Sequence, residues 1–369
     1  MAESTTTLQS LRRSVARQLR MPFIMRVGDS SIVDSGTGTT VVDAALVQTI
    51  TDFWKGHWYY RISDQVYSLI TAFNTSTDTL TTEKTYSPVH AAADVFEIHS
   101  VWNAGEIHAA INRAIDTVKK VFPITGTDES LVIREKYLNY SLSGISNLWK
   151  VQKVWVEYRD NSVTGSVVSA TNGAAVLDAA MPSDVDTNWK ITIYAGTGAG
   201  QIRNISSGAG TTTCSVSINW TTNPDSTSKY RIFDASEERI TWRPFTDYRL
   251  DNAEFPDTMY VNSDYSLYHG LRFRIEYLSL QAALSAEADT TIIPAEYLIN
   301  KTCSILHGAL IASTKADRDL HYAEFKRYDE MANEYLARYA PHSSGTLINQ
   351  ALESGSYFES NDPLNWRVG

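Results

Sequence analysis

Two hydrophobic patterns alternate along the chain, and each predicts a different kind of element. Where apolar residues recur every three or four positions, we expect a helix that buries one face. The clearest case begins at Asn103, which can form a capping box with Glu106 and so marks a helix start. Its apolar face consists of Ile107, Ala110, Ile111, Ala114, Ile115, Val118 and Phe122.

Three further segments have helical patterns. Pro294 suits the first turn of a mostly buried helix that runs to about Ser313. Another helix is expected from about Ala316 to Tyr339, before Pro341. The N-terminal segment is expected to form an amphipathic helix, lined on one side by Leu8, Leu11, Val15 and Leu19.

Other segments alternate with a period of two, which is typical of strands, and they contain an internal repeat. Val41-Val42-Asp43-Ala44-Ala45 is followed by Trp54-Lys55, and Val176-Leu177-Asp178-Ala179-Ala180 is followed by Trp189-Lys190. The aspartate and the tryptophan are eleven positions apart in both copies. We therefore predict two related all-β modules, over residues 30–98 and 163–234.

These patterns predict an α+β fold, in which a helical-bundle core carries the two β-modules as insertions. The core is expected to be discontinuous, formed by residues 99–162 and 235–340. Strand-like stretches at Trp149–Glu157, Arg239–Arg243 and Arg272–Tyr277 are assigned to it. Residues 1–29 are expected to form a basic amphipathic helix or arm, and residues 341–369 an extended C-terminal arm.

Composition excludes several classes of protein. The net charge of −10 argues against a protein that grips nucleic acid, but it suits a wall past which DNA slides. The two cysteines, Cys214 and Cys303, are too few and too far apart for a disulfide framework. No apolar run reaches the roughly 18 residues of a membrane span, and no signal peptide is visible.

The sequence contains no convincing catalytic, cofactor or metal motif, so we expect a non-enzymatic protein. Gly196–Gly200 superficially resembles a phosphate loop, but a strand-like stretch follows it, which favours a hairpin turn. The histidines have no metal-ligand spacing, and no Gly-x-Ser-x-Gly elbow is present. Trp54 and Trp189 could stack on sugars, but their matching positions favour core anchors in both modules.

Two groups of residues are candidates for partner contact. Arg12, Arg13, Arg17 and Arg20 belong to a basic series without an acidic residue between Glu3 and Asp29. Contact with a partner protein is favoured, while contact with DNA or a solvated helix face stays open. In the C-terminal arm, Tyr357, Phe358 and Trp366 are aromatic anchors of the kind that interfaces use.

A glycine-rich turn at Gly198–Ile205 is followed by Trp220 and by a second turn-containing stretch, Asn223–Ile232. This pattern resembles a module found in structural proteins of tailed bacteriophages. The first copy is degenerate, with Asp64-Gln65 in place of the glycine turn. Three other segments are similar to head–tail adaptor and neck proteins: Ala109–Ile115, Leu271–Tyr277 and Ala288–Leu298.

This resemblance implies an adaptor-like core in a subunit of a homo-oligomeric ring, commonly of about twelve copies, beneath the portal protein. Such a ring extends the DNA channel, lets DNA pass without specific binding, and docks the tail or further neck proteins. It implies a chain made in the bacterial cytoplasm and located in the virion. The alternative is a collar, fibre or capsid-decorating protein whose β-modules bind host carbohydrate or other virion proteins.

Overall fold

The computed structural model describes residues 6–19, 33–44, 46, 48–92, 94–159, 162–236, 240–311 and 317–339. The chain forms two compact units. The first comprises Met1–Phe122 and Gln281–Gly369, and the second comprises Pro123–Leu280. About 35% of the described residues lie in strands and 22% in helices, so the protein is mainly β.

The predicted fold class, an α+β protein built on an adaptor-like helical bundle, is therefore wrong. Much of the expected helical core is strand: β10 (Leu148–Tyr158) and β20 (Phe273–Ser279) form a long antiparallel ladder. The reason is visible in their composition, since valine, isoleucine, tyrosine and tryptophan favour the pleated surface of a sheet. These strands bury a core of their own, separate from the core that the helices share.

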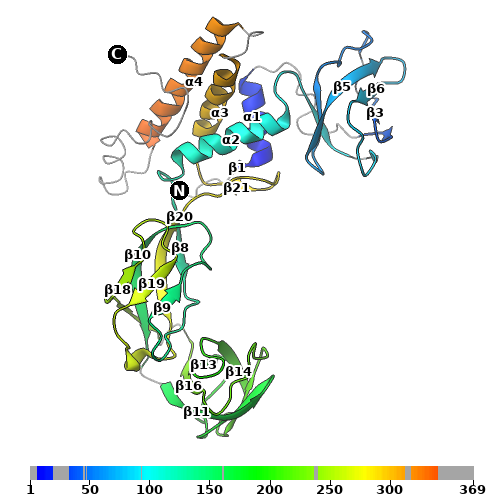
Figure 1. Ribbon diagram of the computed structural model, residues 1–369. Coiled ribbons are helices and arrows are strands. Elements are labelled where there is room, and N and C mark those ends of the chain that lie inside the picture. The colour runs from blue at the N-terminus through cyan, green and yellow to red at the C-terminus, as the bar shows by residue number, and fades with distance from the viewer. Residues whose placement is uncertain are drawn as a thin grey trace. The chain divides into compact units, whose positions relative to one another are not determined.

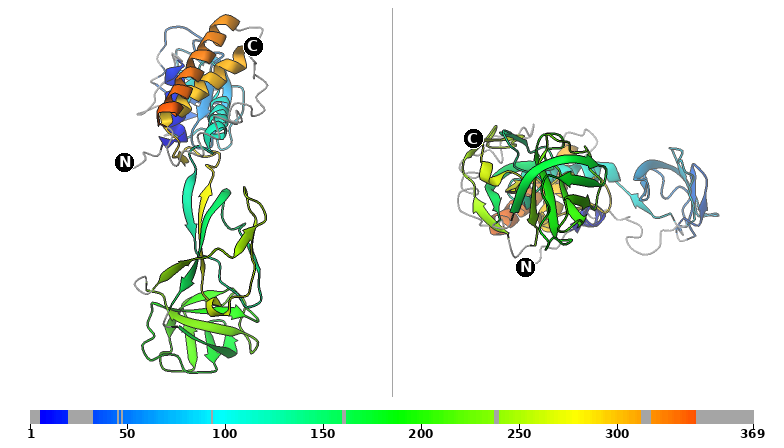
Figure 2. Two further views of the ribbon diagram at one scale, coloured as in Figure 1. Left: turned by 90° about the vertical axis from the view of Figure 1, so that its left-hand side faces the viewer. Right: turned by 90° about the horizontal axis from the view of Figure 1, so that it is seen from below.

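The helices of the first unit pack around one apolar cluster. They are α1 (Leu8–Gln18), α2 (Ala104–Val118), α3 (Ala295–Ile311) and α4 (Arg318–Tyr339). The views in Figures 1 and 2 agree that α3 and α4 lie side by side. The predicted capping box is confirmed, because the Asn103 side chain accepts from the Glu106 N–H while Glu106 accepts from the Asn103 N–H, each at 2.9 Å.

A short two-stranded pairing fixes the start of α1. β1 (Thr6–Thr7) pairs antiparallel with β21 (Thr290–Thr291). The Leu8 N–H then donates to the Asp289 carbonyl at 2.9 Å, and Thr7 caps the helix by accepting from the Ser10 N–H. The N-terminal helix is thus held by residues 289–291, which are far from it along the chain.

The first unit also contains a sheet with the strand order β2-β3-β6-β5-β4-β7. Its strands are β2 (Ser35–Gly36), β3 (Thr40–Val42), β4 (Trp58–Arg61), β5 (Val66–Asn74), β6 (Thr79–Thr82) and β7 (Phe96–His99). Trp54 is fully buried in the core of this sheet, together with Tyr59 and Phe73.

The second unit contains a closed barrel with the order β11-β12-β15-β14-β13-β16. Its strands are β11 (Ser162–Thr171), β12 (Ala174–Leu177), β13 (Trp189–Ala195), β14 (Ile202–Ser207), β15 (Thr213–Val216) and β16 (Lys229–Asp234). This order corresponds strand by strand to that of the first sheet, and β11 closes the barrel by pairing with β16. Trp189 is 5% exposed and lies in the barrel core, so the core interpretation of both tryptophans is confirmed.

Two further sheets complete the second unit, with the orders β17-β10-β20-β8 and β18-β19-β9. The elements not yet given are β8 (Ile124–Asp128), β9 (Asn139–Ser141), β17 (Thr241–Pro244), β18 (Tyr248–Leu250), β19 (Thr258–Val261) and a 3-10 helix, η2 (Ser266–Tyr268). Val154, Phe273 and Ile275 belong to the core that these sheets share.

Candidate functional site

Arg12 and Arg13, two arginines of the N-terminal series, take part in an ion network in the interior of the first unit. Arg12 lies on α1 and is fully buried. Its guanidinium donates twice to the Glu97 carboxylate, from Nε and Nη2, each at 2.9 Å. Nη1 also donates to both oxygens of Glu287 at 2.6 and 2.7 Å. The same guanidinium lies 4.7 Å from the centre of the Tyr60 ring.

Glu97, on β7, is the central anion of this network and is fully buried. Besides Arg12, it accepts a bond from Arg13 Nε at 2.8 Å and lies 3.1 Å from His99 Nε2. Burial by itself would raise the pKa of Glu97. Hydrogen bonds from His99 and Arg12, with the charge of Arg12, outweigh burial and hold that pKa well below its ordinary value.

His108, on α2, joins the network as an acceptor. Its Nε2 lies 2.8 Å from Arg12 Nη1, and an arginine can only donate. Burial and the positive charge of Arg12 together lower the pKa of His108 to about 4. The imidazole ring of His108 is therefore neutral at pH 7. Through Arg12, the network connects α1 with α2, β7 and the segment around Glu287, all within the first unit.

The structure gives the partner-contact candidates different environments. The Arg12 guanidinium forms its hydrogen bonds with Glu97 and Glu287 of the same chain, so Arg12 has a structural role. Arg13 pairs with Glu97, and its side chain is 18% exposed. Arg17 is exposed on α1, so its contact with a partner stays a prediction. Arg20 lies outside the described residues, as do the arm residues Tyr357, Phe358 and Trp366.

The motif that carries the phage resemblance builds two turns of the barrel. Gly196–Gly200 connects β13 to β14 as a hairpin turn, as predicted, and no helix follows it. Gly196 has a φ of +72°, and a Cβ there would lie 2.2 Å from the Thr227 carbonyl oxygen. The glycine is therefore required by the close approach of another turn, and not by a bound phosphate.

Gln201 joins this hairpin to the segment after Trp220. Its Nε2 donates to the carbonyl oxygens of Gly198 and Thr222, at 3.1 and 2.7 Å. Its Oε1 accepts from the backbone N–H of Thr221 at 2.8 Å. Arg203 strengthens the same junction, because Nη2 donates to the Gln201 amide oxygen at 3.2 Å. The side chains of Gln201 and Arg203 thus form these hydrogen bonds within the module.

The second half of the motif forms a comparable junction around Asp225. Its carboxylate accepts from the Thr227 N–H at 2.8 Å and from the Thr197 hydroxyl at 2.7 Å. The Ser228 hydroxyl donates to the Thr197 carbonyl at 2.7 Å. Hydrogen bonds from Thr227 and Thr197 lower the pKa of Asp225. The polar residues of the motif therefore hold the turns of the module together.

The described residues offer little for cofactor or metal chemistry. Among them, no group of three or more histidine, cysteine, aspartate or glutamate side chains is arranged to hold a metal ion. Cys214 and Cys303 are both free and buried, and burial raises the pKa of the Cys214 thiol to about 12. No helix in this part of the chain combines the length and apolar character that crossing a membrane requires.

Sequence reasoning missed the ion network, although one signal was present. Glu97 lies between Phe96 and Ile98 in a strand whose four residues are all buried. A charged residue in such a strand needs a buried partner of opposite charge. The sequence offered Arg12 as a candidate but not the pairing, and Glu287 lies far from both along the chain.

Comparisons with known proteins add little to this picture. No protein-family model matches the sequence, and a search of curated proteins found no significant match. Among solved structures, a chain described as "Virion of native gene transfer agent (GTA) particle" is 9% identical, with a TM-score of 0.19. The match covers 60% of this chain and 68% of that chain. A TM-score this low does not establish a common fold.

Proposed function

We propose that the chain is a non-enzymatic structural subunit of a tailed-phage particle, located at the head–tail junction. The observation that carries the proposal is the agreement between the sequence motif and its use in the barrel. Residues Gly196–Gly200, Gln201, Arg203 and Asp225 form the turn junctions of the second module. A motif that specifies a scaffold, and not a reaction, is what a protein acting through shape and interface area requires.

The location within the particle rests on the other segments of the resemblance. Ala109–Ile115 lies in α2, and Ala288–Leu298 leads through β21 into the start of α3. These segments pack in the core of the first unit, where the Arg12 network holds α1. A firmly held N-terminal helix with an exposed Arg17 can present a fixed charge to a neighbouring copy or to the portal protein.

The charge of the chain suits passage of DNA. The net charge is −10, and exposed acidic residues such as Asp319 and Glu330 lie on α4. Other acids of this helix pair locally, as Glu334 does with Arg338 at 3.4 Å. An acidic wall repels phosphates and so does not retard DNA that moves past it.

Labelling of intact particles tests the proposal directly. Antibodies against the chain, applied to particles of the phage that encodes it, are expected to mark the neck in negative-stain electron microscopy. The purified chain is expected to form closed rings or to join portal protein. Absence of the chain from mature particles, by mass spectrometry, would remove the proposal. Labelling of fibres, collar or the head surface would support the alternative class instead.

A further inference from the structure

Helix α4 has apolar residues on a second side, away from the core of the first unit. α3 covers one side of α4 (Figures 1 and 2). On the core side, Tyr328 and Ala332 of α4 are buried in the apolar cluster that the helices share. Leu320 and Met331, by contrast, are 54% and 40% exposed. The packing within the first unit therefore does not account for these two side chains.

The two exposed apolar residues belong to a row that also contains two charged residues. Leu320, Glu324, Arg327 and Met331 follow one another at spacings of four, three and four positions. Because residues three or four apart are neighbours on a helix surface, the four side chains form one stripe along α4. The same spacing separates the positions at which two helices of a coiled coil meet. The α4 stripe, as we call these four residues, thus has the spacing of a helix–helix contact.

The order of residues in the α4 stripe is complementary to itself. From its N-terminal end, the stripe is apolar, acidic, basic and apolar. A second copy of α4 in the antiparallel direction presents the same residues in reverse order. Leu320 then faces Met331 of the second copy, and Glu324 faces Arg327 of the second copy. Each apolar residue therefore meets an apolar residue, and each charge meets the opposite charge.

Other arrangements of two α4 helices bring like charges together. A parallel pair in register places Glu324 against Glu324 and Arg327 against Arg327. An antiparallel pair shifted by seven positions places Glu324 against Glu334, whose side chain is 68% exposed. Like charges that face each other across a contact cost binding energy and exclude the wrong partner or register. The charges of α4 thus favour one direction and one register.

We propose that α4 pairs antiparallel with α4 of a second copy of this chain through the α4 stripe. Within one helix, Arg327 Nη2 already lies 3.0 Å from Glu324 Oε2. Pairing brings two such ion pairs together, so that each carboxylate lies between two guanidinium groups. Met331 suits the contact, because its unbranched side chain adapts to the shape of a partner surface.

The pairing goes beyond the proposed function and does not rest on it. A ring requires a heterologous contact between neighbours, whereas this contact is isologous and ends at two copies. From Leu320 to Met331, α4 rises by only about 17 Å. A contact of this length buries less area than a standard interface. We therefore expect free chains to pair weakly, and the experiment has to detect a short-lived contact.

Disulfide trapping between full-length chains detects the contact and reports its direction. Chains with Leu320→Cys are mixed with chains with Met331→Cys, and the dimers are identified by mass spectrometry. We expect mixed dimers to form at least about tenfold faster than dimers of either chain with itself, because docking gives millimolar effective concentrations. Parallel pairing would give the opposite result. Cys214 and Cys303 are buried, so they do not contribute to the reaction.

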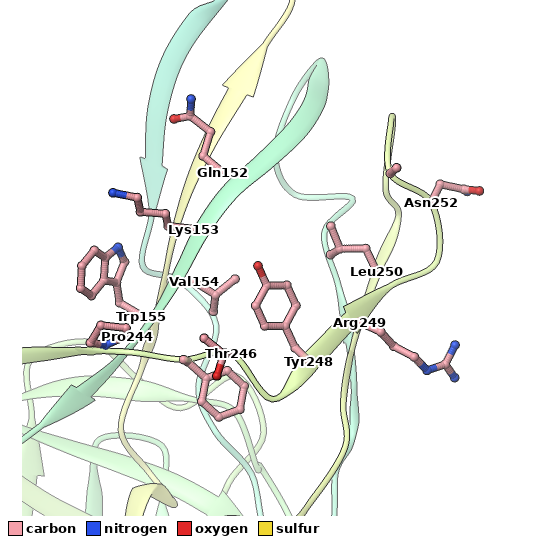
Figure 3. A pocket seen from close by; sticks show the side chains of 12 residues that line it. Gln152, Lys153, Val154, Trp155, Pro244, Thr246, Tyr248, Arg249, Leu250 and Asn252 are labelled. Carbon is pink, nitrogen blue, oxygen red and sulfur yellow. The ribbon is translucent and has the colours of Figure 1, made fainter. Parts of the chain in front are cut away.

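Gln152→Cys provides a matched control for unspecific association. Gln152 is exposed on β10, beside an apolar groove of about 790 Å³ that Val154 and Tyr248 line (Figure 3). A cysteine at this position is as accessible as one in the α4 stripe and also lies next to apolar side chains. Mixed with Met331→Cys chains, it should form disulfides at the background rate.

Exchange of the two charges then tests the register. Glu324→Arg in both cysteine chains places arginine opposite arginine and should slow the mixed disulfide toward the control rate. Adding Arg327→Glu restores the complementary order with the charges exchanged and should recover the fast rate. Recovery would show that the charges, and not damage to the helix, caused the slower reaction. Mixed dimers at the control rate, a rate unchanged by Glu324→Arg, or no recovery in the double exchange would each overturn the proposal.

Discussion

Replacing Arg12 by methionine removes the cation at the centre of the buried network while keeping an apolar stem of similar length. Glu97 loses a two-bond contact, and Glu287 loses the other. Breaking a buried ion pair from one side costs about 3–5 kcal/mol, because the remaining charge is left uncompensated. Glu97 keeps Arg13 and His99, so we expect the lower end of this range, about 3 kcal/mol.

For a domain of this size, such a loss lowers Tm by roughly 6–12 °C. The measurement is urea and thermal unfolding of the full chain, followed by tryptophan fluorescence and circular dichroism. Arg17→Met is the matched control, since Arg17 is exposed on the same helix and should shift stability by less than about 0.5 kcal/mol. Equal stabilities for the Arg12 and Arg17 variants would show that the network contributes nothing and would refute the reasoning.

Three further predictions concern His108 of the same network and two turns of the barrel. His108 has a folded pKa of about 4 against an ordinary 6.5, so the unfolded chain alone binds the proton between these values. Stability should fall by about 3 kcal/mol from pH 6.5 to 4, and His108→Gln should remove that part of the slope in urea titrations at several pH values. Gln201→Ala should destabilise the barrel by about 2–3 kcal/mol in urea unfolding, through loss of the bonds between its turns; a change under about 0.5 kcal/mol would contradict this. Gly196→Ala should cost more than Gly210→Ala in thermal unfolding, because both have positive φ but only the first Cβ would meet neighbouring atoms; equal losses would show that the turns do not approach closely.

Local features could be predicted from the sequence because each depends on residues close together in the chain. The capping box at Asn103 and the hairpin turn at Gly196–Gly200 need only the chemistry of a few neighbours. The buried position of Trp54 and Trp189 followed from the repeat itself. The two sheets also share their strand order, which agrees with the duplicated pattern in the sequence.

The fold class could not be predicted in this way, because it depends on which distant segments pair. β10 pairs with β20 across more than a hundred intervening residues, and nothing local to either strand identifies the other. Their strand character was recognised, yet without the pairing they were assigned to a helical core. The Arg12 network could not be predicted for the same reason, since Glu97 and Glu287 contact Arg12 only in the folded chain.

The ladder between β8 and β20 has a consequence for how this protein could change over time. Ile124 lies opposite Ser279, so the two ends of the second unit are neighbours at the usual spacing of about 5 Å between strands. Because its two ends are close together, the second unit can be replaced by another domain or by a short hairpin without displacing the chain of the first unit, into which it is inserted. Related chains could therefore share the helices of the first unit and differ wholly in the segment inserted between Phe122 and Gln281.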